Sequence, residues 1–538
     1  NKTYNIIIWL RKGTKLKMKE NKFRILFILI VLVIIGFAIF KIYGRNTQKI
    51  SENELRYEKV TMITSLRLGI AEYDSINPLI SKNKEIINMS PIIYEPLFTL
   101  DKQYQIQDCL AKEYSKLNNY CYIIKIRDNV KWQDNTNFTL EDVIFTIDKI
   151  KQLPNSIYYN NVSNIKNVEK IDYNTLRLNL SAEDPWFQFK LTFPILSNTQ
   201  YKTQDFLKTI PIGTGMYKIT KDNENNIEAE KNNSWWNIEI KNAKIEKLKI
   251  YKYSSVGDLY NNFKLGNIDL INTSNTNIQE YVGTIGINLK EYQGREYIYL
   301  ALNCDNKILA NKEVRQAMSY FIDKDTLVSK VLNNKYNVSD FILDYGSYLY
   351  KEEKRNSYNA KKAKEILEAT GWKLNYGKWQ KDGKYIELNL AVNSEDETRV
   401  KIAESIKEQL EDAGIKIYIN KVSLSTYNSY LKNKDYDIIL TGMYNSYSPD
   451  LNTLYAENNL ANYKNEEIFE TLTNINNTTD RTILKEKYNR LIEISQEDVP
   501  YIGLCRNKNI MVCSPNLIGE ISPNNYTCYY NIDTWYRQ

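Results

Sequence analysis

Histidine is absent from the whole chain of 538 residues. Because His is the base of Ser-His and Cys-His hydrolases and a ligand of HExxH zinc sites, its absence excludes those enzymes and metal sites. Glycine and proline are also scarce, at 19 and 11 residues, which argues against long disordered or collagen-like tracts. Most of the chain should therefore fold, and its length suffices for roughly three to four domains.

Cysteine is present but lacks the spacing of a metal or redox site. No two of the six cysteines form a CxxC pair, so a zinc ribbon or a thioredoxin-type site has no support. Two outcomes stay open, which are up to three disulfides or six buried thiols. The cysteines are Cys109, Cys121, Cys304, Cys505, Cys513 and Cys528.

An excess of positive charge is confined to one end of the chain. The net charge is +7, yet residues 1–45 carry ten basic side chains and one acid, so the remainder is slightly acidic. Nucleic-acid binding requires a basic surface on the folded part. We therefore expect no nucleic-acid partner.

One long apolar run is present, at residues 25–40. Extended to residues 23–43, with Arg24 and Lys41 reaching toward the headgroups, it would form a helix of about 31 Å, enough to span a bilayer. The basic segment before it, residues 1–22, predicts a cytoplasmic N-terminus and an extracytoplasmic body. We expect a single-pass anchor in the cell membrane, preceding the fold.

Processing of this segment has two possible routes. No small-x-small pattern follows the apolar run, which favours an uncleaved anchor, while a cleaved secretory signal is the alternative. Met18 opens a compact signal-like start and is a second candidate for the natural beginning. Residues 46–59 are polar and predict a short stalk.

Local patterns predict the first elements of the body. Alternation of polar and apolar residues predicts a strand at residues 65–71, and residues 114–116 and 120–126 predict an antiparallel hairpin. Thr139 can cap a helix whose apolar residues from 140 to 150 recur at helical spacing.

The most regular pattern is a βαβαβ series in the C-terminal half, which implies a parallel sheet with right-handed crossovers. Ligands of such sheets lie beyond the carboxyl ends of the strands, here residues 393–395 and 442–447. A helix stop is expected at Gly414. The series comprises strands at 386–392, 415–419 and 436–441 and helices at 395–413 and 424–432.

Seven phrases, taken in order along residues 66–538, resemble the family 5 solute-binding proteins of ABC importers, the oligopeptide-, dipeptide- and nickel-binding group. Each phrase alone is weak, but their common order makes the resemblance specific. They are residues 94–101 (YEPLFTLD); 126–134 (IRDNVKWQD) with 138–143 (FTLEDV); 211–217 (PIGTGMY); 266–269 (GNID); 313–317 (EVRQA) before Ile322 and Asp323; 363–371 (AKEILEATG); and Tyr436-Asp437 leading into Gly442.

The resemblance implies an α/β fold, a two-lobed periplasmic-binding-protein-like clamshell of type II with three domains, which closes by hinge bending. We expect no enzyme activity, no catalytic residue, no cofactor and no metal. Its partners would be a captured solute and the permease subunits of an ABC importer with their cytoplasmic ATPases. We expect the body to be monomeric. Lobe I would comprise residues 60–91, 208–300 and 505–538, the domain inserted in it residues 92–207, and lobe II residues 301–504.

In peptide-binding relatives an extended peptide lies between two backbone segments and forms β-type hydrogen bonds that ignore side-chain identity. Tyr444 and Tyr447 are expected to contact ligand, whereas Trp132 is expected to pack in the core. By resemblance the first segment is Ser81, Lys82, Asn83, Lys84 and Glu85, and the second is Gly442, Met443, Tyr444 and Asn445, followed by Ser446 and Tyr447.

The chain departs from the peptide-binding pattern near Gly442. Peptide binders usually carry an Asp four residues after that Gly, where it pairs with the ligand's α-ammonium, and often a Trp directly after it. Here the residues are Ser446 and Met443. The charge-assisted bond is therefore missing, or Asp450 or Glu85 supplies it. Nickel is a weaker ligand hypothesis, because its ligand sphere usually recruits a His.

Three alternatives to an oligopeptide importer subunit remain. A membrane-tethered receptor that senses peptide without importing it shares every feature above, and the solute could instead be a sugar or a metal chelate. An acyl-transferring enzyme would use an SxxK motif, which Ser429 with Lys432 and Ser163 with Lys166 match. Neither SDN nor KTG accompanies these pairs, so the enzyme hypothesis is the weakest.

Overall fold

The structure is a computed structural model that describes residues 32–39, 41, 64–283, 286–343, 346–349 and 357–538. The chain divides into two compact units, Asn1–Met62 with Gln538, and Ile63–Arg537. In the described part of the first unit, residues 32–39 and 41 are helical. No helix among the described residues is long and apolar enough to cross a membrane. Most of the predicted anchor at 23–43, with segments 1–22 and 46–59, lies outside the described residues.

A four-stranded sheet begins the second unit and confirms the first predicted strand. Buried and partly buried residues alternate along β1 as the sequence pattern predicts. β1 runs parallel to β10, and the other pairs of this sheet are antiparallel. The order is β1 (Ser65–Ala71), β10 (Lys247–Tyr253), β9 (Asn226–Lys231), β8 (Tyr217–Asp222).

A second four-stranded sheet is antiparallel and contains the predicted hairpin. The helix after it begins with the expected capping box, in which the carboxylate of Asp142 accepts from the backbone N–H of Thr139 at 2.8 Å. The strand order is β4 (Ala111–Asn118), β5 (Cys121–Ile126), β7 (Thr175–Leu180), β6 (Ile165–Lys170), and the capped helix is α3 (Leu140–Lys151).

The largest sheet confirms the βαβαβ series. β17 runs parallel to both β18 and β19, and Gly414 ends the intervening helix with a φ of 90°. The order is β11 (Leu270–Thr273), β20 (Tyr501–Cys513), β12 (Asn288–Leu302), β19 (Ile438–Tyr444), β17 (Glu387–Asn393), β18 (Lys416–Val422), with β13 (Tyr336–Val338) on β20 and crossover helices α12 (Glu397–Asp412) and α13 (Leu424–Asn433).

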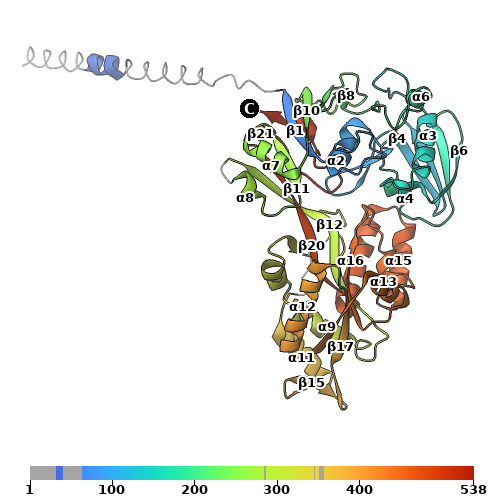
Figure 1. The fold of residues 1–538 in the computed structure, drawn as a ribbon, viewed down its shortest axis with the longest axis vertical. Helices are drawn as coiled ribbons and strands as arrows, with labels where there is room; N and C mark the ends of the chain where they lie inside the picture. Colours follow the sequence, from blue (N-terminus) through green and yellow to red (C-terminus); the bar gives the residue numbers. More distant parts are fainter. Residues whose placement is uncertain (1–31, 40, 42–63, 284–285, 344–345, 350–356) are drawn as a thin grey trace, which may run out of the picture. The chain divides into compact units, whose positions relative to one another are not determined.

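The third strand of this series is longer than the sequence predicts. β19 continues past residue 441 because it pairs with antiparallel β12 as far as Tyr444 opposite Glu296. Gly442 therefore lies within the strand and not beyond its end. The sheet is also mixed, since the long strands β12 and β20 pair with each other in antiparallel fashion (Figure 1).

Smaller elements complete the fold. The short strands are β2 (Phe98–Leu100), β3 (Ile106–Asp108), β14 (Lys373–Asn375), β15 (Lys378–Lys381), β16 (Lys384–Tyr385), β21 (Leu517–Ile518) and β22 (Tyr536–Arg537). The remaining helices are α2 (Lys84–Ile93), α4 (Tyr159–Val162), α5 (Phe187–Lys190), α6 (Asn198–Tyr201), α7 (Val256–Lys264), α8 (Ile278–Val282), α9 (Lys312–Phe321), α10 (Lys324–Thr326), α11 (Ala360–Ala369), α14 (Asn452–Tyr455), α15 (Glu466–Asn477) and α16 (Arg481–Asp498), with a π-helical turn at Leu327–Val331 and a 3₁₀ turn at Ile532–Thr534.

The largest sheet is covered on both faces. Along β12, Ile298 and Leu300 join an apolar cluster with α9, α11 and α12, whereas Tyr297 and Tyr299 join a second cluster with α15 and α16 (Figure 1). Successive residues of a strand point to opposite faces, so two separate cores form on one sheet.

One of the family phrases meets another around a buried carboxylate. Glu95, 3% exposed, accepts from Trp235 Nε1 at 2.9 Å, Trp236 Nε1 at 2.9 Å and Thr214 Oγ1 at 2.8 Å. A Cβ on the neighbouring Gly213 would lie 1.9 Å from the carbonyl oxygen of Ile93. The phrases at 94–101 and 211–217 therefore contact each other in the core and have a structural role.

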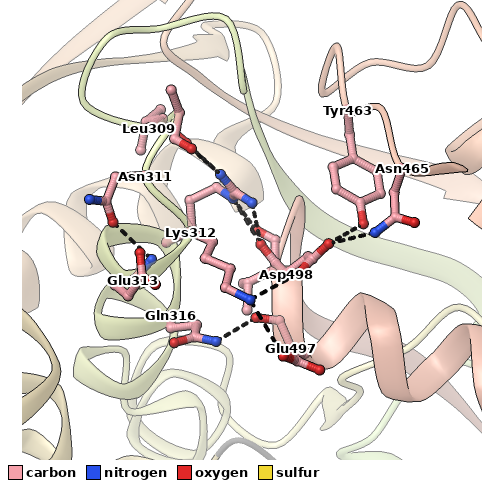
Figure 2. A network of polar contacts seen from close by, with 12 residues as sticks. Leu309, Asn311, Lys312, Glu313, Gln316, Tyr463, Asn465, Glu497 and Asp498 are labelled. Atoms are coloured by element: carbon pink, nitrogen blue, oxygen red, sulfur yellow. Dashed lines mark hydrogen bonds and ion pairs between the residues drawn. The ribbon is translucent and has the colours of Figure 1, made fainter. Parts of the chain in front are cut away.

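A third phrase, residues 313–317, anchors the end of α16. Arg315 is 4% exposed, and its guanidinium donates to the carbonyls of Asp498 at 2.6 Å and Leu309 at 2.6 Å. Figure 2 shows the surrounding contacts, in which Asp498 also accepts from Tyr463 and Asn465. This phrase is therefore structural in the described fold.

Candidate ligand-binding site

A cavity of about 1090 Å³ lies within the second unit and is lined by residues distant in sequence. Its volume is that of a site for a sizeable small molecule or a peptide segment. The wall includes Ile87, Ser90, Pro91 and Tyr94 from α2 and its end; Tyr104, Tyr158, Asn161, Asp184, Trp186, Phe189 and Lys190; Arg295 and Arg506; residues 443–453; and Asn525 and Tyr526.

The predicted residues after Gly442 lie in this wall. Met443, Tyr444, Asn445, Ser446 and Tyr447 all line the cavity, and Tyr444 is 74% exposed. The sequence therefore identified one side of the cavity.

Gly442 itself does not line the cavity. A Cβ at this position would lie 2.6 Å from Nη2 of Arg399 and 3.0 Å from the carbonyl oxygen of Tyr297. Arg399 is held there by an ion pair with Glu296 at 3.1 Å. Position 442 requires a glycine, because the Arg399 side chain lies too close to leave room for a Cβ.

Tyr447 connects the end of β19 to the C-terminal segment. Its hydroxyl donates to the carbonyl oxygen of Asn525 at 2.7 Å. Its ring lies 6.4 Å from that of Tyr104 and 5.5 Å from that of Tyr526, and the Arg295 guanidinium lies 4.3 Å from its centre. This side of the cavity is an aromatic wall with one cation on it.

Residues 81–85 do not line this cavity. The Ser81 hydroxyl donates to Asp74 at 2.6 Å, and Asn83 caps α2 by accepting from the backbone N–H of Glu85 at 3.0 Å. Lys82 and Lys84 are exposed. The next turns of α2 line the cavity instead, so contact of residues 81–85 with a ligand stays a prediction.

Glu85 lies in the first turn of α2, with its side chain half-buried. Burial raises the pKa of its carboxyl to about 7. Hydrogen bonds from Asn272 and Asn88 and the positive charge of Lys84 lower the pKa, but by less than burial raises it. This placement removes Glu85 from the acids that line the cavity.

The cavity wall carries both signs of charge. Asp184 forms an ion pair with Lys190 at 2.6 Å. Asp450 lines the cavity, and its Oδ1 accepts from Asn452 Nδ2 at 2.6 Å. Desolvation by the wall raises the pKa of Asp450, and the nearby Asp184 raises it further. Of the two acids considered as substitutes at Ser446, Asp450 is the one that reaches the cavity.

Sequence reasoning missed the opposite walls. Residues 157–164 and 183–194 lie on short helices and loops that have no hydrophobic period, and Arg295 lies inside a strand. No local signal marks these side chains as cavity residues, because only the tertiary fold brings them beside residues 443–453.

The other sequence candidates lie elsewhere. Trp132 is in the core, as expected, and donates from Nε1 to Asp142 at 3.2 Å. Ser429 and Lys432 are exposed on α13, and neither lines the cavity. All six cysteines are free thiols, four of them buried, so the buried-thiol outcome describes most of them.

Comparison with known proteins gives the chain its family. Residues 105–465 match the model of the bacterial extracellular solute-binding proteins, family 5. The chain is 25% identical to the oligopeptide-binding protein AppA of Bacillus subtilis over 503 residues, which covers 87% of this chain and 90% of AppA.

Solved structures show the same fold. The structure of AppA from Bacillus subtilis in complex with a nonapeptide is similar with a TM-score of 0.54 and 24% identity, over 88% of this chain and 99% of that one. The unliganded open form of MppA, a periplasmic murein tripeptide-binding protein, gives a TM-score of 0.77 at 19% identity, over 88% and 97%. With the family match over most of its length, the chain belongs to the family 5 bacterial extracellular solute-binding proteins.

Proposed function

We propose that this protein captures a peptide-like solute in the cavity beside residues 443–453 and delivers it to the permease of an ABC importer. The observation that carries the proposal is that this cavity of about 1090 Å³ is lined by five of the residues that the family resemblance assigns to ligand binding. AppA, its relative over most of both chains, is an oligopeptide-binding protein. A sensor that does not import, and a sugar or metal-chelate ligand, remain the alternatives.

The backbone at the end of β19 supports a peptide ligand. The N–H of Asn445 donates to the carbonyl oxygen of Arg295 at 2.9 Å, so the backbone polar groups of Asn445 face β12. Those of Tyr444 face the other edge, because strand residues alternate. On that edge β17 pairs only with Ile438 and Ile439 in the described sheet. An extended peptide can add there in β fashion.

The proposal includes a two-lobed, three-domain clamshell with the boundaries given by the family resemblance. Two observations support it. β12 and β20 run between the apolar clusters of both proposed lobes. The cavity wall combines Asp184 and Trp186, from the proposed inserted domain, with Tyr444 and Asp450, from the proposed lobe II.

We further propose a monomeric body tethered by residues 23–43 on the extracytoplasmic side of the cell membrane.

The experiment compares a peptide with its N-acetylated form by calorimetry on the full chain. Ser446 donates to Ser448 and offers no charge, so we expect acetylation to weaken binding about tenfold or less. Ser446→Asp should then favour the free amine by more than tenfold. Ser448→Asp, a substitution two residues further along the same segment, is the matched control.

Two results would change the proposal. A loss of about a hundredfold or more on acetylation of the wild-type ligand would mean that another acid anchors the ammonium, and Asp450→Asn then tests the acid in this wall. If neither peptide form binds, and a screen of native ligands recovers a sugar or a metal chelate, the peptide assignment is wrong.

A further inference from the structure

Arg295 is a cation of the cavity wall whose hydrogen-bonding capacity is only partly used. Its Nε donates to the carbonyl oxygen of Asn445 at 2.7 Å, and its guanidinium lies over the ring of Tyr447. Its two terminal nitrogens have no hydrogen-bond partner among the described residues. Two contacts thus fix the guanidinium while its outer donors remain unused.

The backbone of Arg295 is held by an irregularity of the strand. The pairing of β12 with β20 shifts register between Gln293 and Tyr297. Within this bulge, the side chain of Asn507 occupies the space beside Gly294, where a Cβ would lie 2.0 Å from its Oδ1. The same Oδ1 accepts from the backbone N–H of Glu296 at 2.9 Å. Bulges re-aim side chains, and this one places Arg295 in the cavity wall.

The other cations of the wall are already engaged. Lys190 pairs with Asp184, and Arg506 is 1% exposed and donates to the carbonyl oxygen of Ile342. No carboxylate of the described residues forms an ion pair with Arg295. Among the described residues of the wall, Arg295 is therefore the cation that is both accessible and uncompensated.

We propose that Arg295 is a specificity-determining residue that binds a carboxylate of the ligand. This inference rests on the proposed peptide-binding function and names the group that the cavity selects. A planar guanidinium presents parallel N–H donors that match the two oxygens of a carboxylate. The rings of Tyr104 and Tyr526 beside Tyr447 lower the local dielectric constant, which strengthens such a pair. The carboxylate comes from the peptide C-terminus or from an Asp or Glu side chain.

Three randomised tetrapeptide libraries distinguish these sources. The first, free of Asp and Glu, ends in a carboxylate. The second has the same composition and ends in a carboxamide. The third is the carboxamide library with Glu fixed at one internal position. Each is titrated calorimetrically into the full chain, as wild type and as Arg295→Gln, Arg295→Lys and Arg490→Gln. The last is the matched control, because Arg490 pairs with Glu467 on the surface.

The wild type should bind the free-acid library about tenfold to a hundredfold more tightly than the carboxamide library. Arg295→Gln should abolish this ratio, Arg295→Lys should keep part of it, and Arg490→Gln should keep all of it. If the Glu-containing carboxamides match the free acids, Arg295 accepts a carboxylate from either source. If they match the plain carboxamides, the bound carboxylate is the C-terminus. If only the Glu-containing library binds more tightly than the plain carboxamides, the bound carboxylate is a side chain.

The inference is overturned if the wild type binds all three libraries equally. It is also overturned if Arg295→Gln weakens all three by the same factor, because Arg295 would then only support the wall. Both results leave peptide binding intact. If no library binds the wild type, the proposed peptide function fails and this inference fails with it.

Discussion

At the scale of single residues, Glu85 gives the chain a testable pH dependence. Its carboxyl has a pKa of about 7 in the fold, against the usual 4.5, because burial disfavours its charged form. The folded state therefore holds this proton more tightly than the unfolded chain does. The protonated Glu85 carboxyl therefore stabilises the fold fully below about pH 4.5. This stabilisation is lost as the pH rises to about 7.

The substitution Glu85→Gln removes this titration and keeps the shape of the side chain. The free energy of unfolding of the wild type, relative to the variant, should fall by about 2 to 3 kcal/mol between about pH 4.5 and 7 and then stay constant. Urea denaturation of both proteins across this range measures the difference. Parallel pH profiles would show that Glu85 titrates normally in the fold.

The residues of the cavity differ in how far the sequence predicts them. Met443 lies near the carboxyl end of β19 and Tyr447 follows that strand, where the βαβαβ pattern predicts a ligand-binding edge. Asp184 and Arg295 lack such a signal. Asp184 precedes a four-residue helix, and Arg295 reaches the cavity through a bulge, which depends on the pairing of two distant strands. Such contacts are tertiary and leave no local pattern.

At the scale of helices and strands, Arg315 supports the end of α16. The helix closes with Val499 in the left-handed conformation, φ 48°, and its last carbonyls lack partners within the helix. Arg315, which lies on α9, donates hydrogen bonds to the carbonyl oxygens of Asp498 and Val499. Since the guanidinium is buried, its removal leaves several backbone acceptors without hydrogen bonds.

We expect Arg315→Met to lower the free energy of unfolding by about 3 to 5 kcal/mol. Lys312→Ala, on the same helix, is the matched control, because the Lys312 side chain is 42% exposed and pairs with Glu497 at 3.4 Å. It should cost less than about 1 kcal/mol. Chemical denaturation of the three proteins gives these values. Equal losses in the two variants would contradict the buried role of Arg315.

Elements with a clear period were predicted well, and their ends less so. The helix begun by Thr139 and the three strands of the βαβαβ series lie where the sequence places them. β19 extends to Tyr444 because β12 pairs with it from outside the series. A partner strand that lies more than a hundred residues away cannot be read from the pattern of β19 itself.

At the scale of the whole molecule, charge is distributed unevenly between the first 45 residues and the body. The N-terminal stretch carries ten basic side chains, and the apolar run at residues 25–40 interrupts them. Basic residues that precede a membrane segment stay in the cytoplasm. The cavity must face the outside for a solute-binding protein to meet its ligand, and the predicted orientation meets this requirement.

This orientation predicts the outcome of proteolysis on intact cells. Protease added from outside should digest the body, while a protected fragment in the membrane fraction should retain an N-terminus upstream of residue 25, as read by Edman sequencing. In permeabilised cells, which serve as the control, protease should also reach residues 1–22. The expected anchor depends on the missing small-x-small pattern after residue 40. A mature protein that begins near Arg45 and leaves the membrane fraction would show instead that the segment is a cleaved signal.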